Sequence, residues 1–379
     1  MRSTPSMLLV LGLATASLHA GCGDDPKPAP TGSARPTTTA AASARATASS
    51  AATASAAPAP TPALLHDLGE VAVPADNPQT PAKIALGHQL FFDKRLSKDG
   101  SRACYSCHLN EDGNGGKDPL AIGPGDKVLP RHSPVIWNVA YLSKFYWDGR
   151  SDSLEAQATA AWAGGNMAVG KENLDAKAAE IAKIPAYKKA FDEVFPGEGV
   201  TPATIVKAIA AYERTLVCKD TAYDRYAKGE KSALTEQQQQ GLELFNGKAG
   251  CAMCHAAPFF STAFGAPDGA YFNVGIGTKD KAEADVDVGR MSVTKKDTDW
   301  AAFKPPSLRN VSKSAPYFHD GSVKTLREAV VLMASGGIEN KNRSALLQDK
   351  KLSDAEIDAL VAFLGALDCN TQLEEPKLP

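Results

Sequence analysis

The chain has 379 residues, with 41 lysines and arginines against 43 aspartates and glutamates, and 7 cysteines. Its length suggests two ordinary domains rather than one. A net charge of -2 gives no support to nucleic-acid binding, which usually leaves a strongly basic footprint, and no uninterrupted run of about 18 apolar residues predicts a conventional membrane span.

The N-terminal segment 1–22 has the pattern of an export signal. Arg2 is followed by an apolar run from Met7 to Leu18, and the Gly21-Cys22 step resembles a bacterial lipoprotein cleavage site. His19 departs from that pattern, because such sites prefer an aliphatic residue three before the cysteine. We expect a lipid anchor at Cys22, and secretion with cleavage nearby is the alternative.

The next segment, 23–63, is predicted to be a disordered tether. Almost every residue from Pro26 to Ala63 is alanine, proline, serine or threonine. Such a composition cannot bury enough surface to offset the entropy lost on ordering the chain. The tether would join an anchored end to a folded body from Leu64 to Cys369.

An internal repeat divides the body. A G-x-x-L-F pattern at 87–91 precedes C-x-x-C-H at 104–108, and the same order recurs at 241–245 and 251–255. A repeated unit of this length predicts two related domains. Both G-x-x-L-F patterns should lie on helices, the first following Pro81 and the second following a capping box of Thr235 and Gln238. Further predicted helices are Pro202–Tyr226, Val323–Ala334 and Asp354–Leu367, the last with Ser353 and Glu356 as its capping box.

The two C-x-x-C-H motifs predict two covalently bound c-type haems. Two thiols at this spacing add to the haem vinyl groups, and the adjacent histidine ligates the iron. A zinc site would need four converging ligands, and a thioredoxin-like pair would need a βαβ pattern that is missing here. The expected residues are Cys104, Cys107 and His108 for the first haem, and Cys251, Cys254 and His255 for the second.

These elements predict a mostly α fold with two cytochrome c-like haem domains and long connecting loops. We place the N-terminal haem domain at 64–228 and the C-terminal haem domain at 229–345. A terminal helix within 346–379 is expected to pack back on the N-terminal domain. Cys218 and Cys369 remain, and they form either a disulfide, which an oxidising compartment permits, or two buried free thiols.

The body from Leu64 to Leu367 resembles the bacterial di-haem cytochrome c peroxidase family. The motifs that carry the resemblance are L-F-F-D at 90–93, W-D-G-R at 147–150, P-S-L-R-N at 306–310, P-Y-F-H-D-G at 316–321 and both C-x-x-C-H motifs. The resemblance implies a periplasmic enzyme that reduces hydrogen peroxide to water at the N-terminal haem. Electrons would enter at the C-terminal haem from a small cytochrome c or cupredoxin. Members commonly form homodimers.

The resemblance also assigns roles to single residues. Met333 stands fourteen residues after His319, where the family has the second ligand of the electron-transfer haem, and Met291 is its rival. Trp147 matches the family's tryptophan between the haems, and Gln157 matches its distal glutamine. The alternative for Trp147 and for either methionine is an ordinary core side chain.

Two departures from the family pattern concern the N-terminal haem. Pro124 stands where some members carry a distal histidine ligand, so this haem should be open to substrate as made. His132 stands at the family's calcium-binding asparagine. Imidazole suits calcium poorly, which leaves a calcium site, with the carbonyls of Ser314 and Pro316, open to question, and His132 could instead turn toward the iron.

The second departure removes an acid. Asn166 stands where the family has the glutamate that moves peroxide's proton, and Glu172 is close enough in sequence to replace it. An amide can orient a peroxide but cannot shuttle a proton, so turnover could be slow.

Two other functions remain open. One is a di-haem enzyme that oxidises tryptophan in a partner protein through high-valent iron, which the open N-terminal haem favours and Met333 disfavours. The other is a non-catalytic electron-transfer or sensing lipoprotein, which Asn166 favours.

Overall fold

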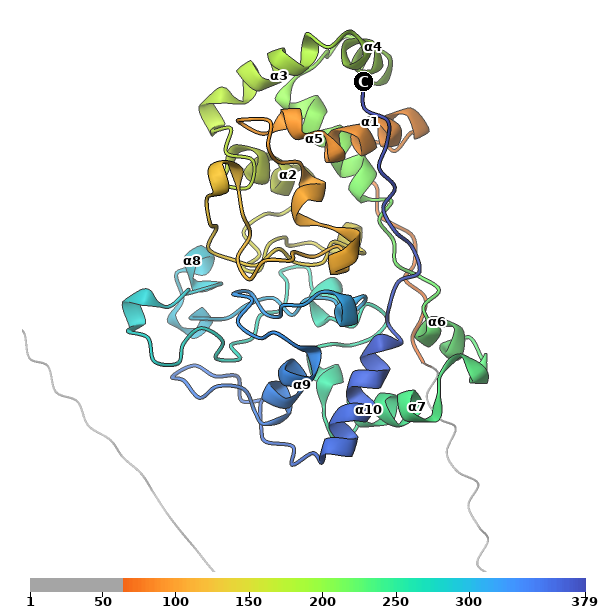
Figure 1. Ribbon diagram of the computed structural model, residues 1–379, viewed down its shortest axis with the longest axis vertical. Helices are drawn as coiled ribbons and strands as arrows, with labels where there is room; N and C mark the ends of the chain where they lie inside the picture. Colours follow the sequence, from red (N-terminus) through yellow and green to blue (C-terminus); the bar gives the residue numbers. More distant parts are fainter. Residues whose placement is uncertain (1–63) are drawn as a thin grey trace, which may run out of the picture. The chain divides into compact units, whose positions relative to one another are not determined.

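The computed structural model describes residues 64–379, and the predicted signal, tether and Cys22 anchor lie outside the described residues (Figure 1). The described chain forms ten α-helices, short 3-10 turns and isolated β-bridges, with no strand, which confirms the mostly α prediction. None of the described helices is long and apolar enough to cross a membrane. The helices are α1 (Pro81–Phe92), α2 (Leu154–Ala163), α3 (Leu174–Ala182), α4 (Pro185–Val194), α5 (Pro202–Glu213), α6 (Ala222–Ala227), α7 (Glu236–Asn246), α8 (Met291–Thr294), α9 (Leu326–Ala334) and α10 (Asp354–Gly365).

The predicted helix starts are confirmed. Pro81 occupies the first turn of α1, after the N-cap Thr80. The capping boxes of α7 and α10 form as expected: the side-chain oxygen of Thr235 accepts a hydrogen bond from the Gln238 backbone N–H, and Ser353 does the same for Glu356.

The single helix predicted over Pro202–Tyr226 was wrong. α5 ends at Glu213, and α6 begins at Ala222 with a new capping box formed by Thr221 and Asp224. Between the two helices the Asn138 side chain binds both the N–H and the carbonyl of Cys218, at 2.8 and 3.2 Å. These tertiary hydrogen bonds replace the intrahelical bonds that a continuous helix would make.

The molecule contains two hydrophobic cores, each built around one pair of crossing helices. In the first core α1 crosses α5, and in the second α7 crosses α10. Both crossings need a glycine, because a Cβ on Gly87 would lie 1.8 Å from the Ala208 carbonyl oxygen and a Cβ on Gly241 would lie 2.0 Å from that of Ala359. The phenylalanine of each G-x-x-L-F pattern is fully buried one helical turn later. The sequence repeat therefore encodes a repeated helix crossing.

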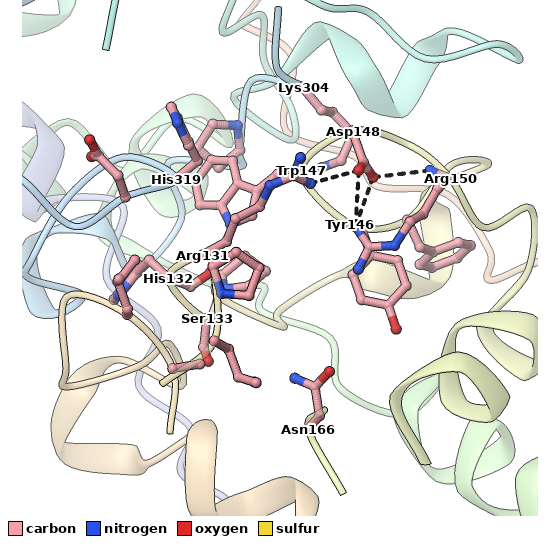
Figure 2. A pocket seen from close by; sticks show the side chains of 18 of the residues that line it. Arg131, His132, Ser133, Tyr146, Trp147, Asp148, Arg150, Asn166, Lys304 and His319 are labelled. Carbon is pink, nitrogen blue, oxygen red and sulfur yellow. Dashed lines mark hydrogen bonds and ion pairs between the residues drawn. The ribbon is translucent and has the colours of Figure 1, made fainter. Parts of the chain in front are cut away.

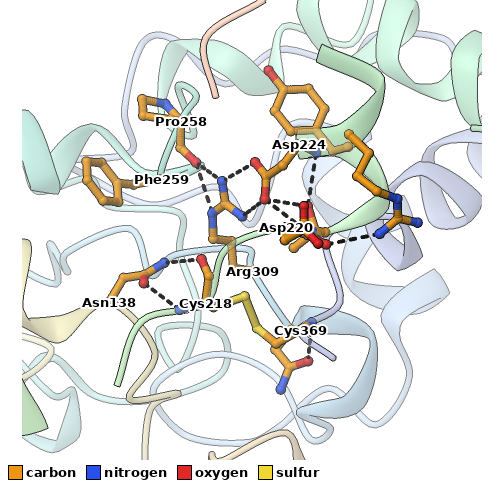
Figure 3. A network of polar contacts seen from close by, with 12 residues as sticks. Asn138, Cys218, Asp220, Asp224, Pro258, Phe259, Arg309 and Cys369 are labelled. Carbon is orange, nitrogen blue, oxygen red and sulfur yellow. Dashed lines mark hydrogen bonds and ion pairs between the residues drawn. A yellow bond between two sulfur atoms is a disulfide. The ribbon is translucent and has the colours of Figure 1, made fainter. Parts of the chain in front are cut away.

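In both helix pairs, a cysteine follows the helix-crossing point at the same distance along the chain, and the two cysteines form the predicted disulfide. Cys218 follows Ala208 by the same ten residues that separate Cys369 from Ala359. The two sulfurs are bonded, with Cα atoms 5.5 Å apart, so the disulfide prediction is confirmed (Figure 3). Asn138 and Asn310, both in the left-handed conformation, each accept the backbone N–H of one of these cysteines. The disulfide thus joins equivalent points of the two cores.

The prediction that the terminal helix packs on the N-terminal domain was wrong. Leu360, Phe363 and Leu364 of α10 belong to the second core, against α7. The residues after the helix cross over instead: Leu373 enters the first core, and its N–H and carbonyl both bind Asn110. Figure 1 shows the C-terminus close to α1 and α4. The apolar face of α10 is taken up by α7, which leaves only the extended tail for the N-terminal lobe.

Arg309 of the P-S-L-R-N motif forms a buried ion pair within the second core. Its two terminal nitrogens lie 2.8 Å from the two carboxylate oxygens of Asp224 on α6, and it also donates to the Pro258 carbonyl (Figure 3). Burial alone would raise the pKa of Asp224, but the hydrogen bonds and charge of Arg309 lower it below its usual value. The pair ties α6 to the loop that follows the second C-x-x-C-H motif.

We expect Arg309→Met to lower the free energy of unfolding by about 3–5 kcal/mol, because Asp224 would be left buried and unpaired. Guanidinium denaturation of the holoprotein at neutral pH measures the loss. The double variant R309M/D224N should recover part of it, since the uncompensated charge is gone. Equal losses in the single and double variants would contradict this account.

Candidate functional site

A cavity of about 1220 Å³ lies where the two lobes meet, and it gathers most of the predicted site residues. His108 and Trp147 line it, as do Gln157 from α2 and Asn166 from the loop after α2. We call this space cavity 1. A second space of about 220 Å³, cavity 2, is lined mostly by residues of the C-terminal lobe.

Each predicted haem-ligating histidine is held in the same way. The Nδ1 of His108 lies 3.3 Å from the Asn114 carbonyl oxygen, and the Nδ1 of His255 lies 3.0 Å from that of Phe260. A carbonyl only accepts, so Nδ1 carries the proton and Nε2 keeps a free lone pair. Although the His108 ring borders an open cavity, loss of water lowers its pKa to about 4, and burial also lowers the pKa of His255. Both rings are neutral and suited to bind a metal.

The four motif cysteines are partly buried and form no disulfide within residues 64–379. Burial raises the pKa of each thiol, to about 11 for Cys251 and Cys254, so none is poised as a thiolate. Among residues 64–379 no group of three or more His, Cys, Asp and Glu side chains could hold a metal ion. This disfavours the zinc alternative.

Cavity 2 brings His255 and Met333 together. Both side chains line it, with Cys251 and Cys254 at its edge and mostly apolar residues elsewhere. Met291, the rival ligand, lies outside this cavity and packs against the small cluster of Val286 and Trp300. The geometry therefore favours Met333 as the partner of His255.

Trp147 lies in the walls of both cavities. Its Nε1 donates to the His132 carbonyl at 2.8 Å, and its own carbonyl accepts the Lys304 N–H at 2.8 Å. Figure 2 shows the indole among the side chains of Arg131, Lys304 and His319. This is where a relay between the cavities would have to lie.

Trp147 and His319 occupy equivalent places in an extended repeat. Each sits in a loop closed by a β-bridge, Phe145 to Ser151 in one and Tyr317 to Val323 in the other. Both loops continue as Asp-Gly, and the residue before each ring has positive φ. The two rings are 6.4 Å apart, so this repeat places both at the junction of the cavities.

The residues that depart from the family pattern lie as follows. Pro124 is buried and does not line cavity 1, so it supplies nothing to that space. His132 lines the cavity, but its Nδ1 is 2.9 Å from the Asp118 carbonyl oxygen. Glu172, the reserve acid, is exposed, does not line the cavity and bonds to neighbouring Asn173. The structure thus gives Glu172 no place beside Asn166.

Comparison with known proteins shows to which family the chain belongs. The family model for di-haem cytochrome c peroxidase matches residues 81–232, and the cytochrome c model matches residues 238–368. The chain is 38% identical over 339 residues to cytochrome-c peroxidase IdrP1 of Pseudomonas sp. (strain SCT), an alignment that covers 83% of this chain and 89% of that protein. The chain belongs to the di-haem cytochrome c peroxidase family. It is also 34% identical to methylamine utilization protein MauG of Methylorubrum extorquens, over 81% of this chain and 84% of that one.

Solved structures of this family share the fold. A MauG-like protein associated with microbial copper homeostasis superposes with a TM-score of 0.74 and 30% identity, covering 82% of this chain and 95% of its own. The diheme peroxidase BthA of Burkholderia thailandensis, at 21% identity and a TM-score of 0.62, shows the same fold. Haem is the cofactor of this family, and the chain's two cytochrome c-type lobes each offer one cavity for it.

The residues around the cavities fit haem, and sequence reasoning missed two of them. Lys304 is buried, lines both cavities and has its pKa lowered to about 8 by burial, with no carboxylate partner within residues 64–379. A haem propionate would supply the missing negative charge. Arg131 bridges Asp148 and Asp287 beside it at 2.6 and 2.7 Å. In the sequence, the only feature that could have pointed to Lys304 is its position two residues before the P-S-L-R-N motif.

Proposed function

We propose that this protein is a periplasmic di-haem c-type peroxidase that reduces hydrogen peroxide to water with electrons from a small cytochrome c or cupredoxin. The observation that carries the proposal is the difference between the two cavities. A neutral histidine stands in each, yet Met333 lines the small apolar cavity 2 together with His255, whereas cavity 1 is large and lined by the amides of Gln157 and Asn166.

The chain's own residues supply the framework for this reaction. Each bound haem would supply an iron that gains and loses one electron at a time. Cys104 and Cys107 would hold one haem by thioether bonds, and Cys251 and Cys254 the other. His108 and His255 would offer Nε2 to the irons, with Met333 completing the second site. A thioether ligand raises the reduction potential, which suits the site that accepts electrons first.

Polar side chains in cavity 1 would bind and orient peroxide. Gln157 and Asn166 can donate and accept hydrogen bonds at the cavity wall but cannot release a proton. Trp147, in contact with both cavities, would serve as the relay between them. Lys304 would neutralise a propionate at the same junction.

A second candidate function is oxidation of a partner protein. It rests on the similarity to MauG and on the absence of a distal ligand at Pro124. Met333 favours the peroxidase, because di-haem enzymes that oxidise a partner protein often carry tyrosine rather than methionine on the second haem. The third reading, a non-catalytic haem lipoprotein, draws its support from Asn166 alone.

The location and the remaining partners are also proposals. The export signal, the lipid anchor at Cys22 and the tether over 23–63 would hold the enzyme at a membrane surface facing the periplasm. A calcium ion near His132 would take the carbonyl oxygens of Ser314 and Pro316, because the imidazole offers no oxygen. A homodimer is proposed because members of the family commonly form homodimers.

Stopped-flow spectroscopy of the purified holoprotein tests the proposed function. Fully ferric protein should react with peroxide without prior one-electron reduction, and should then oxidise a reduced cytochrome c or cupredoxin. Failure to react in both the ferric and the half-reduced protein would overturn both enzyme functions. An oxidised N-terminal haem with two histidine ligands would overturn the open-site assignment.

We expect Trp147→Phe to slow oxidation of the donor by about tenfold or more, equivalent to at least about 1.4 kcal/mol of barrier. The reason is that the indole is the side chain shared by the two cavities. Trp162→Phe is the matched control, because Trp162 is also buried but donates to the Leu96 carbonyl and lines neither cavity. Similar rates for both variants would argue against the relay.

A further inference from the structure

A buried carboxyl group in cavity 1 has no assigned role. Glu213, the last residue of α5, lines this cavity and is 8% exposed. Its Oε2 has no hydrogen-bond partner within residues 64–379. A buried polar atom without a partner is costly to fold, so it calls for an explanation.

The surroundings of Glu213 keep it protonated near neutral pH. Burial is the main cause that raises its pKa to about 8, and the carboxylate of Glu155 adds to the effect. Arg214 acts in the opposite direction, but its guanidinium is turned away to Glu155, at 2.7 Å. The other titratable neighbours, Tyr146 and Tyr212, are neutral, because their own pKa values are raised.

Two other carboxylates in the wall of cavity 1 are paired with cations. Asp148 and Asp287 are both paired with Arg131, and Asp148 also binds Arg150. Asp285 and Asp320 also line the cavity, but Asp285 is exposed and Asp320 accepts the Ser322 N–H. Among the described residues, Glu213 is the buried acid of the cavity wall that has no cation on its carboxyl oxygens. It is therefore the one suited to hold and release a proton.

The internal repeat supplies a comparison within the same molecule. Glu213 precedes Cys218 by five residues, as Leu364 precedes Cys369. Leu364 is buried and lines cavity 2. Glu213 on α5 and Leu364 on α10 thus occupy equivalent positions. The cavity proposed to bind peroxide has a carboxyl group at this position, and the other cavity has an aliphatic side chain. The repeat therefore uses a buried side chain at this place in both halves, and the carboxyl group is specific to cavity 1.

Peroxide reduction consumes two protons, and neither Gln157 nor Asn166 can supply one. We propose that Glu213 is the proton-supplying residue of cavity 1. This inference rests on the proposed function. As the O–O bond breaks and two molecules of the reduced donor protein supply one electron each, one proton passes from the Glu213 carboxyl, directly or over a water, to the leaving oxygen. Solvent supplies the second proton and then reprotonates the carboxylate, so that two waters are released.

Tyr146 lies in the same cavity wall as Glu213. The charge of Glu213 acts on the Tyr146 hydroxyl, which donates to the Gln157 carbonyl at 3.1 Å. Glu213, Tyr146 and the Gln157 amide of α2 thus line one cavity.

The test compares Glu213→Gln with Glu172→Gln in the holoprotein. The wild-type rate of peroxide reduction should fall as pH rises through about 8, because the acid form is needed. E213Q should be about 10²-fold slower below that pH and should lose the pH dependence. E172Q, which changes an exposed glutamate outside the cavity, should keep the wild-type profile. E213L, which copies Leu364, should fold and match E213Q.

An infrared difference spectrum between acidic and alkaline pH, recorded without peroxide, gives a second readout. The wild type and E172Q should lose a protonated-carboxyl band across about pH 8, and E213Q should lack it. A wild-type rate profile in E213Q, or a loss of rate in E172Q, overturns the inference while the proposed function stands. A wild type that does not reduce peroxide overturns both, and the infrared band then reports only where Glu213 titrates.

Discussion

Asn166→Glu should accelerate peroxide reduction, because it places a carboxyl group where the cavity wall now has an amide. Acid–base assistance contributes about 10²- to 10⁴-fold, and the gain here should lie toward the lower end, since Glu213 already supplies one proton. In the Glu213→Gln background the same substitution should recover most of the lost rate. Cavity 1, at about 1220 Å³, has room for the extra methylene beside bound haem. Single-turnover stopped-flow rates at neutral pH measure both gains.

Asn166→Gln is the matched control for that experiment. Glutamine has the length of glutamate but no proton to give, so the rate should stay near that of the wild type. An equal gain in both variants would show that side-chain length, rather than proton transfer, limits the reaction. No gain from N166E in either background would mean that Asn166 does not stand at the position of the family's glutamate.

Covalent chemistry explains which site residues could be predicted from the sequence. Attachment of haem by two thiols fixes the spacing of Cys104, Cys107 and His108, so the pattern survives in any fold that uses it. The fourteen-residue step from His319 to Met333 likewise led to the side chain that shares cavity 2 with His255. Capping boxes are equally local, which is why the starts of α7 and α10 were predicted correctly.

Tertiary contacts explain the features that sequence reasoning missed. The break after Glu213 depends on Asn138, which binds Cys218 from a distant loop. The direction of α10 depends on Gly241, whose missing side chain lets α7 approach it. Glu213 and Lys304 read as ordinary charged residues of a helix and a loop, because nothing nearby in sequence shows that both are buried against a cavity.

The repeat explains more of the molecule than the two C-x-x-C-H motifs. It includes the helix crossings, the asparagines that hold Cys218 and Cys369, and the loops of Trp147 and His319. Where the two halves agree, the residues build the framework. Where they differ, as at Glu213 and Leu364, the difference separates a polar cavity from an apolar one. Comparison of the two halves is therefore a way to find functional residues within one chain.

The double variant C218A/C369A should lose about 5 kcal/mol of unfolding free energy if the chain-entropy model holds, because the disulfide spans 151 residues. Long loops lose the most entropy on closure, and this bridge ties the end of α10 to the segment after α5, one from each core. Denaturant unfolding of the holoprotein should show a lower midpoint. Separate transitions for the two lobes should emerge as well, since the link between the cores is gone.

Chemical reduction of the wild type provides the control, because reductants open a disulfide but leave thioether bonds to haem intact. Reduced wild type and C218A/C369A should unfold at the same denaturant concentration. A loss below about 1 kcal/mol in both would mean that the clamps of Asn138 and Asn310 hold the two ends without the bridge. In that case the disulfide would contribute little to the stability of the fold. The oxidising compartment to which the predicted signal directs the chain would then matter for haem attachment and peroxide chemistry, but not for this bridge.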